Sequence, residues 1–133
     1  MMKFPEEGVT NFVAMTVRDA DAMLDFYKNA LGLEEAFTDD ADEGVTKYYL
    51  KFRGGMLKMF APDKEPEKGR IDVTGISGYR LNTFLVSNMT ELFEELTQKG
   101  VRIVSPMQSS GGDQKWGIIS DPEGNLIEIA GTG

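Results

Sequence analysis

The sequence contains neither cysteine nor histidine. Without cysteine the chain has no disulfide, no thiolate nucleophile and no thiolate metal ligand. Without histidine it lacks the commonest transition-metal ligand, the usual general base and the serine–histidine pair of many hydrolases. Any chemistry must therefore use carboxylates, lysine, arginine, tyrosine, serine or threonine.

Basic residues and long apolar runs are also scarce. The 14 Lys and Arg residues are outnumbered by 22 Asp and Glu residues, which gives a net charge of −8 and argues against nucleic acid or anionic membrane as a partner. No apolar run approaches the roughly 20 residues that cross a bilayer, and residues 1–7 lack the hydrophobic segment of a signal peptide. We therefore expect a cytoplasmic protein.

The 133 residues, 41% hydrophobic and 27% charged, predict one globular domain. Alternating apolar residues over 9–17 indicate a strand, which is followed by a helix that Asp19 or Asp21 caps and Gly32 ends. A short strand over 33–38 precedes an acidic stretch at 39–44, which is either a solvated loop or a weak cation site. A hairpin over 45–61 that turns at Gly54-Gly55 completes this half.

The pattern starts again after a linker-like segment at 62–78. A strand over 80–86, a helix capped by Asn88 or Thr90, a strand over 101–105 and a Ser/Gly-rich loop over 106–114 lead to a last hairpin that turns at Asp121–Gly124. Within that loop, Gly111-Gly112 either turns the chain or hinges a flap.

Both halves thus follow the order β-α-β-β-β, at a spacing of 69 or 70 residues that aligns Lys58 with Glu128. We predict an α+β fold of two modules, residues 9–61 and 79–130, joined by residues 62–78 in a single domain over 1–133. The modules pack together within one chain or exchange between two.

Three motifs carry a resemblance to a known family. They are the opening run Asn11–Asp19, the helix with Asp25-Phe26-Tyr27 and Leu31-Gly32-Leu33, and the closing run Asp121–Glu128. In this order the chain resembles the vicinal oxygen chelate superfamily, which contains glyoxalase I, the extradiol dioxygenases and the bleomycin-resistance proteins. The resemblance extends from about Val9 to Ile129 and implies the glyoxalase-like fold, a concave, barrel-like mixed sheet with helices outside.

The resemblance also implies a position for a metal centre. The metal enzymes of this superfamily carry ligands on four strands, at positions that correspond here to Phe12, Lys58, Leu81 and Glu128. Phenylalanine and leucine offer no lone pair and an ammonium group repels a cation, so only Glu128 can be a ligand. We expect neither a metal nor another cofactor.

The other residues expected on the concave face of the sheet are mostly apolar. Such a face suits the binding of a small organic molecule, cationic or aromatic. We expect the protein to resemble the bleomycin-resistance proteins, which bind their ligand as homodimers. The candidate ligand-binding residues are Phe12, Met56, Lys58, Phe60, Leu81, Trp116 and Glu128.

Other interpretations of these residues stay open. Lys58 and Glu128 either pair with each other or contact a ligand. Trp116 either anchors the packing or stacks on a ligand. The apolar candidates either contact a ligand or pack in the core or a dimer interface. The alternation of apolar and polar residues along their strand does not decide whether Tyr48 or Tyr49 points toward the concave face of the sheet. The alternative function is an isomerase, lyase or dioxygenase-type enzyme that uses Glu128 as a base or weak metal ligand. A third possible function is that of an interaction or regulatory module, in which side chains fill the concave face of the sheet.

Overall fold

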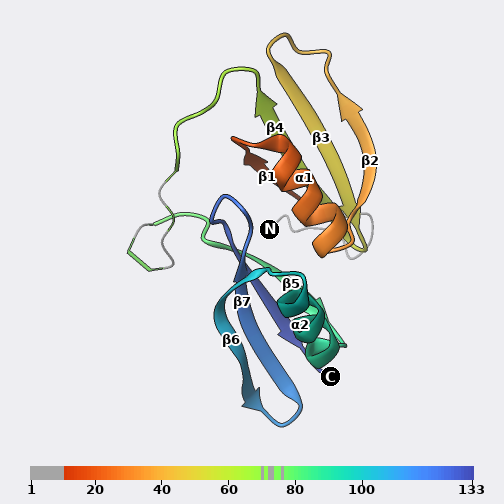
Figure 1. Cartoon of the computed structure of the whole chain (residues 1–133), viewed down its shortest axis with the longest axis vertical. Helices are drawn as coiled ribbons and strands as arrows, with labels where there is room; N and C mark the ends of the chain where they lie inside the picture. Colours follow the sequence, from red (N-terminus) through yellow and green to blue (C-terminus); the bar gives the residue numbers. More distant parts are fainter. Residues whose placement is uncertain (1–10, 70, 72–73, 76) are drawn as a thin grey trace, which may run out of the picture. The chain divides into compact units, whose positions relative to one another are not determined.

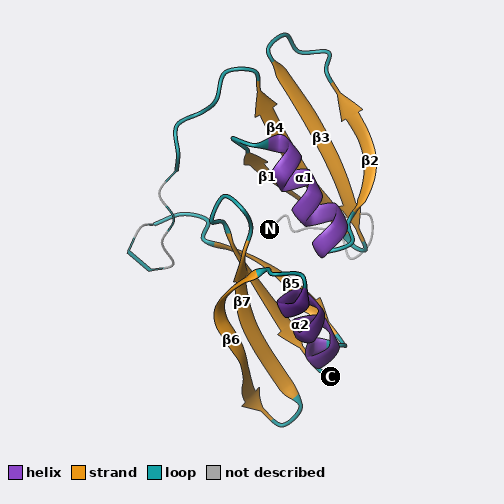
Figure 2. Cartoon of the chain, viewed as in Figure 1, coloured by secondary structure: helices purple, strands orange, loops and turns teal. Residues whose placement is uncertain are grey.

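The computed structural model describes residues 11–69, 71, 74–75 and 77–133. The chain divides into two compact units, Met1–Glu67 and Lys68–Gly133. Each unit contains a four-stranded sheet with a helix across one face (Figures 1 and 2). In the part of the chain that the structure describes, no helix is long and apolar enough to cross a membrane.

The first strand of the first unit is β1 (Asn11–Thr16). Val9 and Thr10, with which the predicted strand begins, lie outside the described residues. The helix α1 (Ala20–Asp25) continues as a π-helical turn η1 (Phe26–Ala30), and β2 (Glu34–Asp39), β3 (Val45–Phe52) and β4 (Gly55–Pro62) follow. The strand order is β1-β4-β3-β2, with β1 parallel to β4 and the other pairs antiparallel.

The second unit repeats this arrangement. It consists of β5 (Leu81–Val86), α2 (Met89–Gln98), β6 (Arg102–Gly111), β7 (Gln114–Ser120) and β8 (Leu126–Gly131), in the strand order β5-β8-β7-β6. The parallel pairing places Ala14 beside Lys58 in the first sheet and Thr83 beside Glu128 in the second. The predicted α+β class and the β-α-β-β-β repeat are therefore confirmed.

Each sheet has one buried face, which the helix covers. In the first unit the buried side chains on α1 and η1 are Met23, Phe26 and Tyr27, and those on the sheet are Leu50, Leu57 and Met59. In the second unit the buried apolar side chains are Met89, Phe93 and Leu96 on α2 and Ile119, Ile127 and Ile129 on the sheet. The alternate residues of the same strands point to the opposite side, which we call the open face of each unit.

The two helices begin in different ways. The Asp19 carboxylate accepts a hydrogen bond from the Ala22 amide at 3.0 Å, so Asp19 is the N-cap, and Asp21, the other predicted candidate, lies in the first turn. Asn88 occupies the N-cap position of α2 but makes no side-chain cap bond. The Met89 and Thr90 amides instead donate to the carbonyl groups of residues 132 and 133, at 3.0 and 2.8 Å.

The predicted loop over 106–114 was wrong, because β6 runs on to Gly111. Gln108 pairs with Trp116 and Gly111 with Gln114, although bulges interrupt the register. Serine and glycine are weak strand formers, and pairing with β7 overrides this preference. Gly111 and Gly112 have φ values of 118° and 57°, so they turn the hairpin.

The turn between β3 and β4 lies one residue earlier than predicted, at Arg53-Gly54. Gly54 has a φ of 101°, which favours glycine. Gly55 already belongs to β4, and a Cβ there would lie 2.3 Å from the Asn11 carbonyl oxygen. Gly55 is thus required for the close approach of β1 and β4.

Candidate functional site

The open face of the first unit brings together four of the seven candidate residues. Phe12 on β1 pairs with Met56 on β4, and Lys58 and Phe60 follow at every second position of β4. Phe12 is 50% exposed, whereas the other three side chains are half-buried. The predicted alternation along these two strands therefore places Phe12, Met56, Lys58 and Phe60 on one surface.

Aromatic rings surround the Lys58 ammonium. Its Nζ lies 4.7 Å from the centre of the Phe60 ring and 5.3 Å from that of Tyr49. Tyr49 pairs with Lys58 across β3 and β4, whereas Tyr48 pairs with the buried Met59. Tyr49 is thus the tyrosine on the open face, and its ring holds the ammonium by a cation–π contact.

A further aromatic side chain extends this group. The Phe37 ring on β2 stacks on Tyr49 with a centroid separation of 4.1 Å and an interplanar angle of 19°, and Phe37 is 51% exposed. Sequence reasoning missed Phe37 because a bulge between Glu35 and Phe37 shifts the register of β2. We call Phe37, Tyr49, Lys58 and Phe60 the aromatic–lysine cluster.

Two other lysines share this face, and both have carboxylate partners. Lys47 forms an ion pair with Asp42, and Lys51 forms one with Glu34 at 3.4 Å. The hydrogen bond from Lys47 lowers the pKa of the Asp42 carboxyl and raises the pKa of Lys47. Lys58 differs from both, because it forms no ion pair with any described residue of the first unit.

The open face of the second unit carries the other three candidates. Glu128 on β8 lies between Thr83 on β5 and Ile118 on β7, and the Thr83 hydroxyl donates a hydrogen bond of 3.2 Å to its carboxylate. Leu81 lies two residues before Thr83 on the same side, and Trp116 lies two residues before Ile118. Glu128 is thus a half-buried carboxylate with mainly apolar neighbours in the sheet.

The four positions implied for a metal centre do not fit one. The first unit presents Phe12, which has no lone pair for a metal ion, and Lys58, whose ammonium repels one, and the second presents Leu81 and Glu128. Among the described residues no group of three or more carboxylates is arranged to hold a metal ion. These four residues supply one ligating side chain, whereas a tetrahedral protein site uses three or four.

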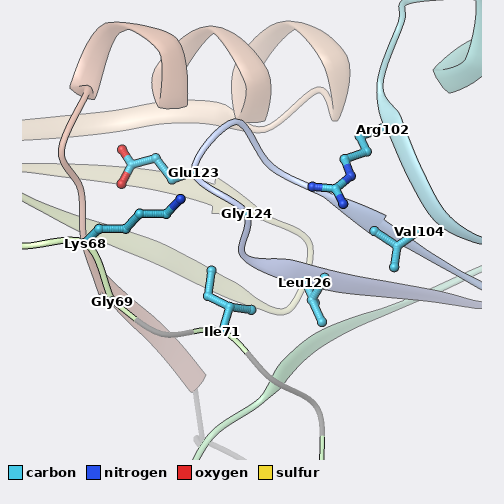
Figure 3. A pocket seen from close by; sticks show the side chains of 8 residues that line it. All are labelled: Lys68, Gly69, Ile71, Arg102, Val104, Glu123, Gly124 and Leu126. Atoms are coloured by element: carbon cyan, nitrogen blue, oxygen red, sulfur yellow. The ribbon is translucent and has the colours of Figure 1, made fainter.

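A pocket of about 340 Å³ lies in the second unit, beside the turn between β7 and β8 (Figure 3). The apolar side chains of Ile71, Val104 and Leu126 form part of its lining, and the charged ones of Lys68, Arg102 and Glu123 accompany them. Sequence reasoning treated residues 62–78 only as a linker, and nothing in the sequence pattern placed Lys68 and Ile71 beside β6 and β8.

The Asp121 carboxylate organises this turn. It is 4% exposed and accepts hydrogen bonds from the Glu123 and Asn125 amides, both at 2.9 Å, and from the Asn125 side chain at 2.8 Å. Gly124 has a φ of 89° and donates to the Asp121 carbonyl, as expected for the predicted turn. The carboxylate fixes the start of β8 and thereby the position of Glu128.

Comparison with solved structures gives the same fold. A protein designated SMU.1112c is 24% identical, with a TM-score of 0.80 over 94% of this chain and 99% of its own. A glyoxalase family protein from Enterococcus faecalis is 22% identical, with a TM-score of 0.72 over 94% and 97%. A lactoylglutathione lyase from Agrobacterium tumefaciens is 20% identical, with a TM-score of 0.67 over 96% of both chains.

A comparison with curated proteins finds no match. A family model, in contrast, matches residues 10–129, nearly the whole chain, and its description is the Glyoxalase/Bleomycin resistance protein/Dioxygenase superfamily. The motifs at Asn11–Asp19 and Asp121–Glu128 fall within this match. The chain therefore belongs to the Glyoxalase/Bleomycin resistance protein/Dioxygenase superfamily.

Proposed function

We propose that the protein is a cytoplasmic homodimer that binds a small, flat organic molecule on its open sheet faces without a metal ion, as bleomycin-resistance proteins of its superfamily bind their ligand. The observation that carries this proposal is the partial exposure of aromatic side chains near Lys58 on the first unit's open face. Phe12 and Phe37 are 50% and 51% exposed. Partly exposed aromatic side chains commonly bind flat ligands by stacking on them.

Exposed aromatic area is a source of binding free energy. Burying a whole phenylalanine side chain contributes about 1.5–3 kcal/mol, so covering the exposed half of one contributes about 1 kcal/mol. Phe12 and Phe37 together would supply about 2 kcal/mol, and stacking adds about 0.5–1.5 kcal/mol for each ring pair. These sums support micromolar binding only if a polar group of the ligand is also recognised.

Calorimetry and Trp116 fluorescence with a panel of aromatic compounds test the proposal. We expect at least one compound to bind, and Phe12→Ala to weaken that binding by about tenfold. Tyr79→Ala is a matched control, because Tyr79 is fully exposed outside the strands. The absence of both heat and fluorescence change with every compound would overturn the proposal. Sedimentation velocity tests the homodimer, which a concentration-independent monomer would exclude.

The hydrogen bond between Thr83 and Glu128 favours a second candidate function. A carboxylate held among apolar neighbours can act as a general base or as a weak metal ligand, as in an isomerase, lyase or dioxygenase-type enzyme. Equilibrium dialysis with zinc, nickel, manganese and iron would separate the two candidates. Stoichiometric metal binding that Glu128→Gln abolishes and Glu123→Gln leaves intact would favour the enzyme.

A further inference from the structure

We propose that the aromatic–lysine cluster of the first unit binds small aromatic anions, whose carboxylate or phosphate contacts Lys58 while the ring stacks on the neighbouring aromatic side chains. This inference rests on the proposed function and specifies the charge of the ligand at this face. The net charge of −8 alone favours a cationic ligand. The local structure around Lys58 leads to the opposite sign.

Two aromatic rings hold the charge of Lys58, and no carboxylate of the first unit's described residues neutralises it. The Phe60 and Tyr49 rings, at 4.7 and 5.3 Å, attract the ammonium through their negative faces. A cation–π contact leaves N–H donors of the ammonium available, because a lysine carries three. Among the described residues of the first unit no carboxylate pairs with Lys58, in contrast to Lys47 and Lys51 on the same face. An anionic ligand would complete this set of interactions.

The aromatic part of the ligand follows from the stacked pair beside Lys58. The Phe37 ring lies parallel to the Tyr49 ring at 4.1 Å and keeps half of its surface exposed. A planar ring with an anionic substituent can stack on the exposed part of Phe37, or on Phe12 across the sheet, and direct its charge toward Lys58. A cationic ligand would face the Lys58 ammonium with like charge.

Long-range repulsion from the acidic surface does not prevent this binding. Charges on an exposed surface are screened over about 8 Å at physiological ionic strength. Asp42 is a carboxylate whose charge interacts with that of Lys58, and Lys47 already pairs with that carboxylate. An anion that contacts Lys58 therefore meets an ammonium group directly, whereas more distant carboxylates are screened.

Three compounds with one ring system test the inference: 2-naphthoate, 2-naphthamide and 2-naphthylmethylammonium. Calorimetry should show the carboxylate binding about tenfold more tightly than the neutral amide, and the amine more weakly than both. The preference should decrease in 0.5 M salt, because the anion–ammonium interaction is partly exposed. Equal or tighter binding of the amide or the amine would overturn the inference, while the proposed function would stand.

Variants locate the interaction. Lys58→Gln should remove the tenfold preference for the carboxylate, Lys58→Arg should keep it, and Phe37→Ala should weaken all three compounds to a similar extent. Lys51→Gln is the matched control, because Lys51 is on the same face but is paired with Glu34, and we expect its effect to stay below about twofold. A preference that survives Lys58→Gln would overturn the inference, and failure of all three compounds to bind would count against the proposed function itself.

Discussion

Replacing Asp121 with alanine should release the turn between β7 and β8 and destabilise the second unit. The buried carboxylate accepts three hydrogen bonds of 2.8–2.9 Å from Glu123 and Asn125. A hydrogen bond to a charged group contributes about 1.5–3 kcal/mol. Because Glu123 and Asn125 are only half-buried, water can replace part of what is lost, and we expect a total loss of about 3 kcal/mol.

Thermal and urea denaturation followed by circular dichroism measure this loss. In a domain of this size, 1 kcal/mol corresponds to roughly 3–5 °C in Tm, so Asp121→Ala should lower Tm by about 10–15 °C. Asp121→Asn keeps one acceptor oxygen and should lie between the wild type and the alanine variant. The urea m-value should not change, because the surface exposed on unfolding stays the same.

The matched control is Asp113→Ala in the other hairpin of the second unit. Asp113 is exposed in the turn between β6 and β7, so its removal should change stability by less than about 0.5 kcal/mol. If Asp121→Ala costs no more than Asp113→Ala, the turn is held by its backbone alone, and the role assigned to the carboxylate is wrong.

Three further changes test the packing and the electrostatics. Gly117→Ala should cost about 1–3 kcal/mol in denaturation experiments, because its Cβ would lie 2.4 Å from the Phe93 ring, and adding Phe93→Leu should recover part of the loss. Gly131→Ala should be more damaging and resist such rescue, because its Cβ would lie 1.8 Å from a backbone carbonyl oxygen at a φ of 139°. The hydrogen bond from Lys28 lowers the pKa of the Glu35 carboxyl below 4.5, so its stabilisation is present above pH 4.5 and is lost as the pH falls through the lowered pKa. An NMR titration should show that Lys28→Met returns the pKa of Glu35 toward 4.5, and an unchanged value would contradict this cause.

The local pattern of the sequence predicted much of the fold. Strand alternation placed Leu126, Glu128 and Ala130 on one face, and the structure buries Ile127 and Ile129 on the other. The repeat was visible because both modules keep the same element order and spacing. These features depend on neighbouring residues, which a single sequence displays directly.

Features that depend on distant residues could not be predicted. The Ser/Gly-rich part of β6 forms a strand because β7 pairs with it, and the first amides of α2 are bonded by residues at the end of the chain. The candidate site was incomplete for the same reason. The sequence placed Lys58 on the open face, but the stack of Phe37 on Tyr49 depends on a bulged register that no local pattern shows.

The backbone bonds at the start of α2 have a consequence for hydrogen exchange. The first amides of a helix normally exchange quickly, because they lack partners within the helix. Here the Met89 and Thr90 amides are bonded to the carbonyl groups of Thr132 and Gly133. Their exchange rates should therefore follow the detachment of the last residues from α2 rather than fraying of the helix itself. These two amides would serve as an internal probe of whether the C-terminal segment stays docked when a ligand or a substitution perturbs β8.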